Sequence, residues 1–328
     1  MTEKKRIVSG MRPTGALHLG NFHGALENWI TMQDVYDCFF FVADWHALTS
    51  DYEDTGNIPA YTRQMIIDWL STGLSPEKNT LFIQSHIKEH AELFLLLSMI
   101  TPTPWLERNP TYKDQIDQLK NKDLSTFGFL GYPVLQAADI IIYKAQGVPV
   151  GIDQVPHIEI TREIARRFNY LYGNVFPEPK SILTKIAKIL GTDRRKMSKS
   201  YHNAIYLSDS PEAIMETVSK MITDPQRARK TDPGNPDICN VFAFHSFYSD
   251  QASVSTINEE CRSAKIGCVE CKKMMAESLI KALAPIREKN RYFTGHPEIV
   301  DDIIATGDKK ARGVAENTLR EVREAINL

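Results

Sequence analysis

The stretch Asp37-Cys38-Phe39-Phe40-Phe41-Val42-Ala43 decides the fold, because nearly every residue in it is apolar. A strand of this composition is covered on both faces, which is typical of parallel sheets. We predict further strands at residues 5–9 and 80–84, and helices at residues 21–33 and 59–73. The order strand, helix, strand, helix, strand predicts an α/β fold with a Rossmann-like, doubly wound parallel sheet.

The composition is that of an ordinary globular protein, with 328 residues, 42% hydrophobic and 24% charged. A formal net charge of -2 indicates no global attraction to nucleic acid, although local basic patches can still contact RNA phosphates. The N-terminus lacks the apolar stretch of a signal peptide, and no window approaches the length of a membrane helix. We therefore expect a cytoplasmic protein that makes no membrane contact.

A change of pattern near residue 205 divides the chain in two. Beyond Pro211 nearly every periodic segment is helical, including residues 308–326. We predict a Rossmann-type catalytic domain over residues 1–205 and a C-terminal helical domain over residues 206–328.

The loop Ser9-Gly-Met-Arg-Pro-Thr-Gly-Ala-Leu-His-Leu-Gly-Asn21 joins the first predicted strand to the first helix. Glycines before a helix N-terminus leave backbone N–H groups free for a phosphate. The loop has neither the GxGxxG spacing of dinucleotide-binding folds nor the GxxxxGK[ST] spacing of P-loops. Taken alone, it fits an ordinary strand-to-helix turn equally well.

A second loop ends in Lys196-Met197-Ser198-Lys199-Ser200. A lysine-rich loop is by itself usually solvated surface. Paired with His18-Leu19-Gly20-Asn21, it resembles the HIGH and KMSKS motifs of the class I aminoacyl-tRNA synthetases. The resemblance implies that ATP lies across the switch point of the sheet with Mg²⁺ on its phosphates. It also implies that His18, Lys196 and Lys199 are the catalytic contacts of the triphosphate.

The chemistry of such an enzyme explains these residue types. Attack of an amino-acid carboxylate on the α-phosphorus of ATP develops negative charge, and the carboxylate needs no deprotonation at neutral pH. Positioning and positive charge therefore suffice. The chain departs from the family where Asn21 replaces the second histidine of HIGH and where Arg12 replaces the usual glutamine. The resemblance implies ATP contacts from Arg12, Pro13, Thr14, Gly20, Asn21, Gly151, Ile152, Asp153, Ile189, Lys196, Met197, Ser198, Lys199 and Ser200.

A predicted helix places Tyr132, Gln136 and Asp139 on one face, where they could be satisfied core residues or a polar binding site. The segment from Gly151-Ile-Asp-Gln154 to Arg162 resembles the tryptophanyl-tRNA synthetases, and the resemblance extends from Ser9 to the C-terminal helices. It implies that Asp139 accepts the indole N–H of L-tryptophan. It also implies that Tyr132 and Gln154 hold the substrate ammonium group. The implied tryptophan site comprises His46, Tyr132, Gln136, Asp139, Val148, Val150 and Gln154.

Gln136 leaves a second interpretation open, because many bacterial tryptophan enzymes have methionine there and a Gln-x-x-Asp pair resembles the tyrosine enzymes. His46 and the segment after Gln154 favour tryptophan. A different adenylyl-transferring enzyme or a catalytically silent paralogue that senses tryptophan or binds RNA are further alternatives. The family also uses a lysine ahead of Tyr132, for which Lys113, Lys120 and Lys122 are candidates.

Four of the five cysteines, Cys239, Cys261, Cys268 and Cys271, form the pattern C-x21-C-x6-C-x2-C. The pattern indicates a metal site, and its spacing distinguishes neither zinc from a [4Fe–4S] cluster nor a metal site from unligated thiols. Some tryptophanyl-tRNA synthetases carry a four-cysteine iron–sulfur cluster near their anticodon-binding region. The resemblance therefore implies a [4Fe–4S] cluster, with Zn²⁺ as the alternative, in an anticodon-binding C-terminal domain. It further implies a homodimer whose partner is tRNA(Trp).

Overall fold

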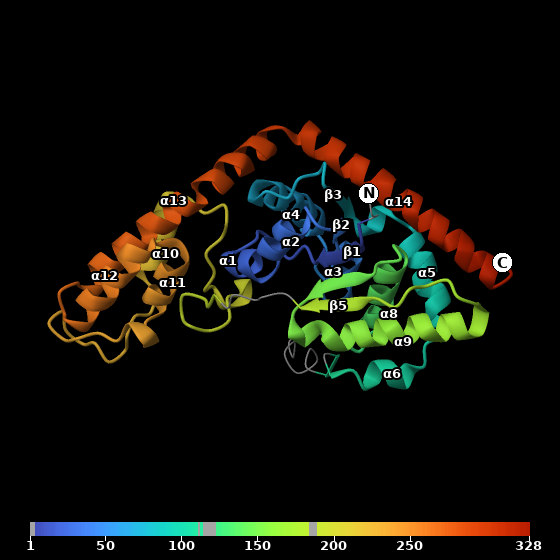
Figure 1. Cartoon of the computed structure of the whole chain (residues 1–328), viewed down its shortest axis with the longest axis horizontal. Helices are drawn as coiled ribbons and strands as arrows, with labels where there is room; N and C mark the ends of the chain where they lie inside the picture. The colour runs from blue at the N-terminus through green and yellow to red at the C-terminus, as the bar shows by residue number, and fades with distance from the viewer. Residues whose placement is uncertain (1–3, 111, 114–122, 184–188) are drawn as a thin grey trace. The chain divides into compact units, whose positions relative to one another are not determined.

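A computed structural model describes residues 4–110, 112–113, 123–183 and 189–328. Its elements, labelled in Figure 1, are β1 (Arg6–Met11), α1 (Leu19–Asn21), η1 (Phe22–Leu26), α2 (Glu27–Met32), β2 (Asp37–Val42), α3 (Asp44–Asp51), α4 (Ile58–Thr72), β3 (Asn79–Ile83), η2 (Gln84–His86), α5 (Glu89–Ser98), α6 (Thr103–Glu107), α8 (Phe127–Ile141), β4 (Gly147–Val150), η3 (Ile152–Gln154), α9 (Val155–Tyr172), β5 (Lys180–Leu183), η4 (Lys199–Tyr201), α10 (Pro211–Ser219), η5 (Pro236–Ile238), α11 (Asn240–Tyr248), α12 (Gln251–Arg262), α13 (Cys268–Gly295) and α14 (Pro297–Ala325). None of the described helices is both long and apolar enough to cross a membrane.

The strands form one five-stranded sheet in the order β3-β2-β1-β4-β5, and every pair is parallel. Strand β2 pairs with β1 along its whole length, from Arg6 opposite Asp37 to Met11 opposite Val42. On its other side β2 pairs with β3. The parallel α/β fold predicted from the sequence is confirmed.

The aromatic side chains of β2 alternate between two covered faces of the sheet. Phe40 stacks on Trp29 of α2, with ring centroids 4.3 Å apart and planes at 5°. Phe39 points to the opposite face, where its ring lies 5.1 Å from that of Tyr143. Figure 1 shows α2 and α4 on one side of the sheet and α8 and α9 on the other. This double covering explains why β2 contains almost no polar residue.

The predicted element boundaries are largely confirmed for β1, β2, β3 and α4. The helix predicted over residues 21–33 instead begins at Leu19 and contains the π-helical turn η1. Strands β4 and β5 were not predicted, because each has only four residues and β4 contains Pro149, which normally signals a break.

The chain forms two compact units. The sheet unit comprises Met1–Gly15, Asn28–Lys185 and His296–Leu328, and the helical unit comprises Ala16–Glu27 and Ile186–Gly295. These units divide the chain differently from a boundary at residue 205, because α14 returns to the sheet and residues 16–27 join the helical unit. The assignment of catalytic and anticodon-binding roles to residues 1–205 and 206–328 stays a prediction.

Helix α14 packs directly along the edge strand β3 and beside α5 (Figure 1). Asp308 accepts a hydrogen bond from the backbone N–H of Ile83 at 3.2 Å and lies 2.6 Å from Nδ1 of His86. At Gly307 the helix approaches the strand so closely that an added Cβ would lie 1.8 Å from the carbonyl oxygen of Leu81. Only glycine fits there, and the helix thereby covers a sheet edge that would otherwise be open to pairing.

We expect Gly307→Ala to lower the free energy of unfolding by about 1–3 kcal/mol, because the methyl group must push α14 away from β3. Gly313→Ala is the matched control, since nothing lies within 4 Å of a Cβ at that position of the same helix. The control should be neutral or stabilising by up to about 1 kcal/mol. Urea unfolding measures both, and equal effects of the two substitutions would contradict the close approach.

Candidate active site

The two sequence motifs lie together in the helical unit. Residues 17–19 and 205–207 form a short antiparallel bridge, in which His18 is paired with Tyr206. The N–H of Leu19 donates to the carbonyl of Ile205 at 3.0 Å, and the N–H of Leu207 donates to the carbonyl of Leu17 at 2.9 Å. These bonds join the HLGN box to the chain just after the KMSKS loop.

His18 is held in one orientation by Asn21. Nδ1 of His18 accepts a hydrogen bond from the backbone N–H of Asn21 at 3.2 Å, and the Asn21 side chain accepts from the N–H of His18 at 3.1 Å. Burial, followed by the charges of Lys199 and Lys196, lowers the pKa of His18 to about 4. The imidazole is therefore neutral at pH 7, and its single proton lies on Nε2 because Nδ1 accepts.

The buried side chain of Asn203 holds the KMSKS loop through hydrogen bonds. Its side-chain amide donates to Asp193 at 2.7 Å and to the carbonyl of Lys196 at 3.1 Å, and its oxygen accepts from the N–H of Ser198 at 2.8 Å. Gly191 permits this arrangement, because a Cβ there would lie 2.2 Å from the Asn203 amide nitrogen. The loop has a defined backbone even though Lys196 is exposed.

The remaining phosphate-site candidates of the helical unit belong to this loop or lie close to it. Met197 and Ile189 are buried, and Gly20 lies against Met197, since an added Cβ would be 3.3 Å from the Cβ of Met197. Lys199 is partly buried and starts the short 3₁₀ helix η4 together with Ser200. The three predicted catalytic side chains, His18, Lys196 and Lys199, thus lie in one unit and interact electrostatically.

In the sheet unit a polar network surrounds Asp139, whose side chain has no exposed surface. Oδ2 lies 2.8 Å from Nε2 of His46, and Oδ1 lies 2.5 Å from Nδ1 of His90. The amide of Gln84 donates to both oxygens at 2.9 Å. Burial opposes ionisation, but the hydrogen bonds from the two histidines hold the pKa of Asp139 below its usual range. The predicted residues Asp139 and His46 are therefore in direct contact.

A second network reaches Tyr132. Its hydroxyl lies 3.3 Å from Nε2 of His157, whose Nδ1 is 3.2 Å from the amide nitrogen of Asn109. Burial, with a smaller contribution from the charge of His46, lowers the pKa of His157 to about 4. Burial also raises the pKa of Tyr132, an effect that the positive charge of Arg12 partly offsets. His157 is therefore neutral at pH 7 and supports the hydroxyl group of Tyr132.

Other predicted residues of the sheet unit are placed by β1, α8, β4 and η3. Arg12 is exposed and donates to the hydroxyl of Ser50 at 3.3 Å. Gln136 is half-buried and lies in α8, the helix that also carries Tyr132 and Asp139. The amide of Gln154 donates to Asp153 at 3.1 Å. Val148, Val150 and Pro13 are buried, Gly151 is half-buried, and Thr14, Ile152 and Lys113 are exposed, whereas Lys120 and Lys122 lie outside the described residues.

The four cysteines of the helical unit are free thiols, and Cys261 and Cys271 interact electrostatically with the others. Nη1 of Arg227 lies 3.9 Å from Sγ of Cys261 and 3.8 Å from Sγ of Cys268. Burial, reinforced by the other three thiols, raises the pKa of Cys271 to about 12. Within the described ranges, no three His, Cys, Asp or Glu side chains form a group that could hold a metal ion. The described structure therefore does not show the predicted metal site, which stays a prediction.

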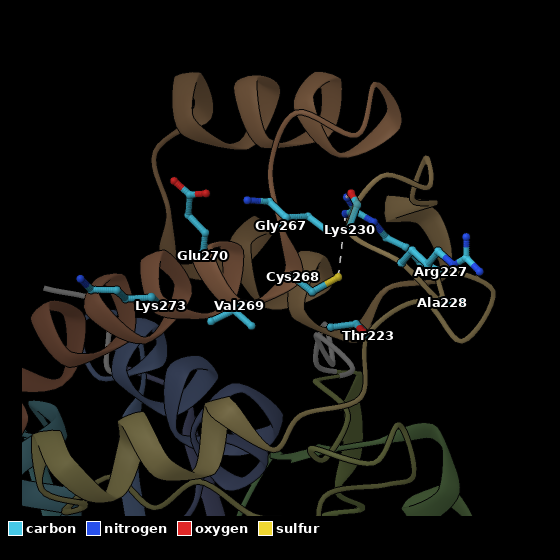
Figure 2. A pocket seen from close by; sticks show the side chains of 10 residues that line it. Thr223, Arg227, Ala228, Lys230, Gly267, Cys268, Val269, Glu270 and Lys273 are labelled. Carbon is cyan, nitrogen blue, oxygen red and sulfur yellow. Dashed lines mark hydrogen bonds between the residues drawn. The ribbon is translucent and has the colours of Figure 1, made fainter.

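A basic cavity of about 550 Å³ opens beside Cys268. Figure 2 shows Arg227 reaching across it to Cys268, with Lys230, Glu270 and Lys273 at its margin. Its lining residues are Thr223, Arg227, Ala228, Arg229, Lys230, Gly267, Cys268, Val269, Glu270 and Lys273, so four cations face one carboxylate.

The roles of several residues that support these sites could not be predicted from the sequence. Gln84, His90 and Asn203 carry no motif, and each contacts a predicted residue that is distant along the chain or across a loop. His157 belongs to the segment after Gln154 that carries the family resemblance, but its hydrogen bond to Tyr132 became visible only in the structure.

A parallel α/β sheet combined with paired HLGN and KMSKS motifs defines a class I aminoacyl-tRNA synthetase. The model of the tRNA synthetases class I (W and Y) matches residues 1–284. The tryptophan–tRNA ligase of Thermotoga maritima is 55% identical over 325 residues, covering 98% of this chain and 99% of the relative. That of Aquifex aeolicus is 46% identical over 393 residues, covering 98% and 100%.

The crystal structure of tryptophanyl-tRNA synthetase from Campylobacter jejuni, complexed with ADP and tryptophan, has a TM-score of 0.91 and 32% identity, and the match covers 98% of this chain and 100% of that one. The chain belongs to the bacterial tryptophanyl-tRNA synthetases, which are class I enzymes. The predicted tryptophan–tRNA ligase is confirmed at the level of the family, against the tyrosine alternative.

The depressed pKa of His157 predicts a pH-dependent stability. Between pH 6.5 and pH 4 the unfolded chain binds a proton at this position that the folded chain does not, so the free energy of unfolding falls as the pH falls. We expect His157→Gln to reduce the loss of unfolding free energy between pH 7 and pH 5 by about 2 kcal/mol. Urea unfolding at both pH values measures it, and equal losses in both proteins would show that His157 titrates normally.

Proposed function

We propose that the enzyme binds L-tryptophan in the sheet unit around Asp139 and ATP phosphates in the helical unit around His18 and the KMSKS lysines. A carboxylate oxygen of tryptophan attacks the α-phosphorus, and the bond from that phosphorus to pyrophosphate breaks. A terminal hydroxyl of tRNA(Trp) then attacks the carbonyl carbon of the adenylate and releases AMP. The presence of tryptophan and ADP in the Campylobacter jejuni structure supports both ligands.

The buried carboxylate of Asp139 is the observation that carries the tryptophan assignment. An ionised carboxylate accepts in about four directions, and three side chains make four contacts with it, because Gln84 reaches both oxygens. We infer that the indole N–H takes the place of His46 at Oδ2, since His46 is the only one of the three donors with exposed surface and the indole ring offers one donor and no acceptor. A phenol hydroxyl brings an acceptor as well, which would lie unsatisfied against the carboxylate. Tyr132 and Gln154 are the proposed partners of the substrate ammonium group, and Gln136, Val148 and Val150 of its ring.

The phosphate chemistry fits the helical unit. A neutral His18 donates from Nε2 without the charge that two adjacent lysines would repel. Lys196 and Lys199 supply the positive charge that stabilises the pentacovalent phosphorus and the leaving pyrophosphate. Mg²⁺ would neutralise the remaining phosphate charge. Contacts of ATP with the other predicted residues, from Arg12 to Asp153, stay predictions.

Amino-acid-dependent exchange of pyrophosphate into ATP tests the proposal. We expect exchange with tryptophan and at least about 10³-fold less with tyrosine at equal concentration, because the wrong ring leaves a buried polar group unpaired. Asp139→Ala should remove most of the exchange with tryptophan. Exchange with tyrosine alone, or with neither amino acid, would reject the proposed binding site.

The role of Lys199 is tested by its replacement with alanine. We expect Lys199→Ala to slow single-turnover formation of tryptophanyl-adenylate by more than about tenfold, since a charged contact of the transition state is lost. Lys220→Ala is the matched control, because Lys220 is an exposed lysine of the same unit paired with Glu216. The control should keep the wild-type rate, and an unchanged rate in Lys199→Ala would remove Lys199 from the mechanism.

We also propose that Cys239, Cys261, Cys268 and Cys271 bind a [4Fe–4S] cluster, with Zn²⁺ as the alternative. The proposal is supported by the four thiol ligands themselves, which interact electrostatically with one another, and by the guanidinium of Arg227, which faces two of the sulfurs. Such a group would tie η5, α12 and α13 together and stabilise the helical unit.

Anaerobic purification followed by iron and sulfide analysis tests the cluster. We expect about four irons per chain and an absorbance band at about 400 nm, and we expect Cys268→Ser to lose both. Stoichiometric zinc without iron would establish the alternative, and neither metal would reject the site.

The partners follow from the same function. Three of the four cations of the basic cavity, Arg229, Lys230 and Lys273, suit the phosphates of an RNA, and tRNA(Trp) is the proposed RNA. A homodimer and a cytoplasmic location are proposed from the family resemblance.

A further inference from the structure

Two fully buried side chains, His90 and Tyr143, are linked to the oxygen of Asp139 that His46 does not contact. We propose that His90 and Tyr143 are positioning residues that set tryptophan specificity, by aiming the Asp139 carboxylate at the indole N–H. The inference rests on the proposed function, in which Asp139 receives that N–H.

The two residues form a directional chain of hydrogen bonds that ends on the carboxylate. Nδ1 of His90 lies 2.5 Å from Oδ1 of Asp139, and Nε2 lies 2.6 Å from the hydroxyl oxygen of Tyr143. A carboxylate only accepts, so Nδ1 carries a proton. Burial raises the pKa of Tyr143 well above its ordinary value, so the phenol keeps its proton and donates it to Nε2. Each partner thereby fixes the tautomer of the imidazole.

The aromatic core prevents the imidazole of His90 from turning. Its ring lies 6.1 Å from that of Phe41, 6.3 Å from that of Phe82 and 5.4 Å from that of Tyr143. His90 and Tyr143 have no exposed surface. Water therefore cannot compete for their hydrogen bonds, and the close packing holds both side chains in one conformation.

The carboxylate needs such a support, because rotation about the last torsion of an aspartate is soft. Gln84 donates equally to both oxygens, at 2.9 Å each, and so does not distinguish them. His90 contacts Oδ1 alone, which leaves Oδ2 as the oxygen on the side of His46. Because the side chain of His46 is 12% exposed and that of Asp139 is not exposed at all, Oδ2 is the oxygen nearer to a ligand.

The consequence is a specific effect on substrates that donate from the ring. L-Tryptophan and L-β-(3-benzothienyl)alanine have nearly the same shape, but sulfur replaces the indole N–H in the second. If His90 aims Oδ2, its loss weakens the use of tryptophan and leaves that of the sulfur analogue nearly unchanged. A purely structural role would weaken the use of both substrates alike.

The test is the ratio of kcat/KM for tryptophan to kcat/KM for the sulfur analogue, measured by pyrophosphate exchange. We expect the ratio to fall about tenfold in His90→Leu, which removes both hydrogen bonds. Tyr143→Phe removes one hydroxyl group at nearly constant volume and should lower the ratio about threefold. His90→Asn is the rescue variant, because its amide nitrogen replaces Nδ1, and it should keep the ratio within about threefold of wild type.

The outcomes separate this inference from the function on which it rests. A wild-type ratio near one would reject the contact between Asp139 and the indole N–H itself. A high wild-type ratio that survives in Tyr143→Phe and His90→Leu would overturn the positioning role alone. If His90→Leu does not fold, the pair Tyr143→Phe and His90→Asn decides, because a threefold drop in the first with rescue in the second supports positioning and any other result overturns it.

Discussion

A carboxylate that water cannot reach must find all of its hydrogen-bond partners inside the protein, and Asp139 imposes this constraint on the sheet unit. Its partners come from α3, η2 and α5, while Asp139 itself belongs to α8. A charge buried without these donors would cost several kcal/mol. Four elements are therefore held in register around one side chain, and the same side chain is the proposed recognition group for the substrate.

Histidines in both units work as neutral groups with a defined tautomer. At His18 the proton is directed to Nε2 because Asn21 occupies Nδ1. His18 is the N-cap residue of α1, and the side chain of Asn21 accepts from the His18 backbone N–H, which completes a capping box. His157 stands in a similar relation to Tyr132, with Asn109 on its other nitrogen. Burial rather than a charge partner is the largest contribution to both depressed pKa values.

The two compact units show how motifs from distant parts of the chain come together. The HLGN box follows β1 in the sequence but belongs to the helical unit, where backbone hydrogen bonds join it to the chain just after the KMSKS loop. Asn203 holds that loop without touching any predicted catalytic side chain group, through the carbonyl of Lys196 and the N–H of Ser198. Helix α14 follows the helical unit in the sequence but belongs to the sheet unit, where it covers the edge of β3. Gly307 is the residue that permits this close contact.

The sequence by itself determined the parallel α/β fold and the family, because these depend on local signals: the apolar run of β2 and two short motifs. The roles of the individual site residues stay predictions. The sequence missed β4 and β5, because each has only four residues and β4 contains Pro149. Only the tertiary structure decided that His90, Gln84 and Asn203 support the sites and that α14 packs on β3. Those roles depend on contacts between residues far apart along the chain or on opposite sides of a loop, and no periodicity or motif reports such contacts.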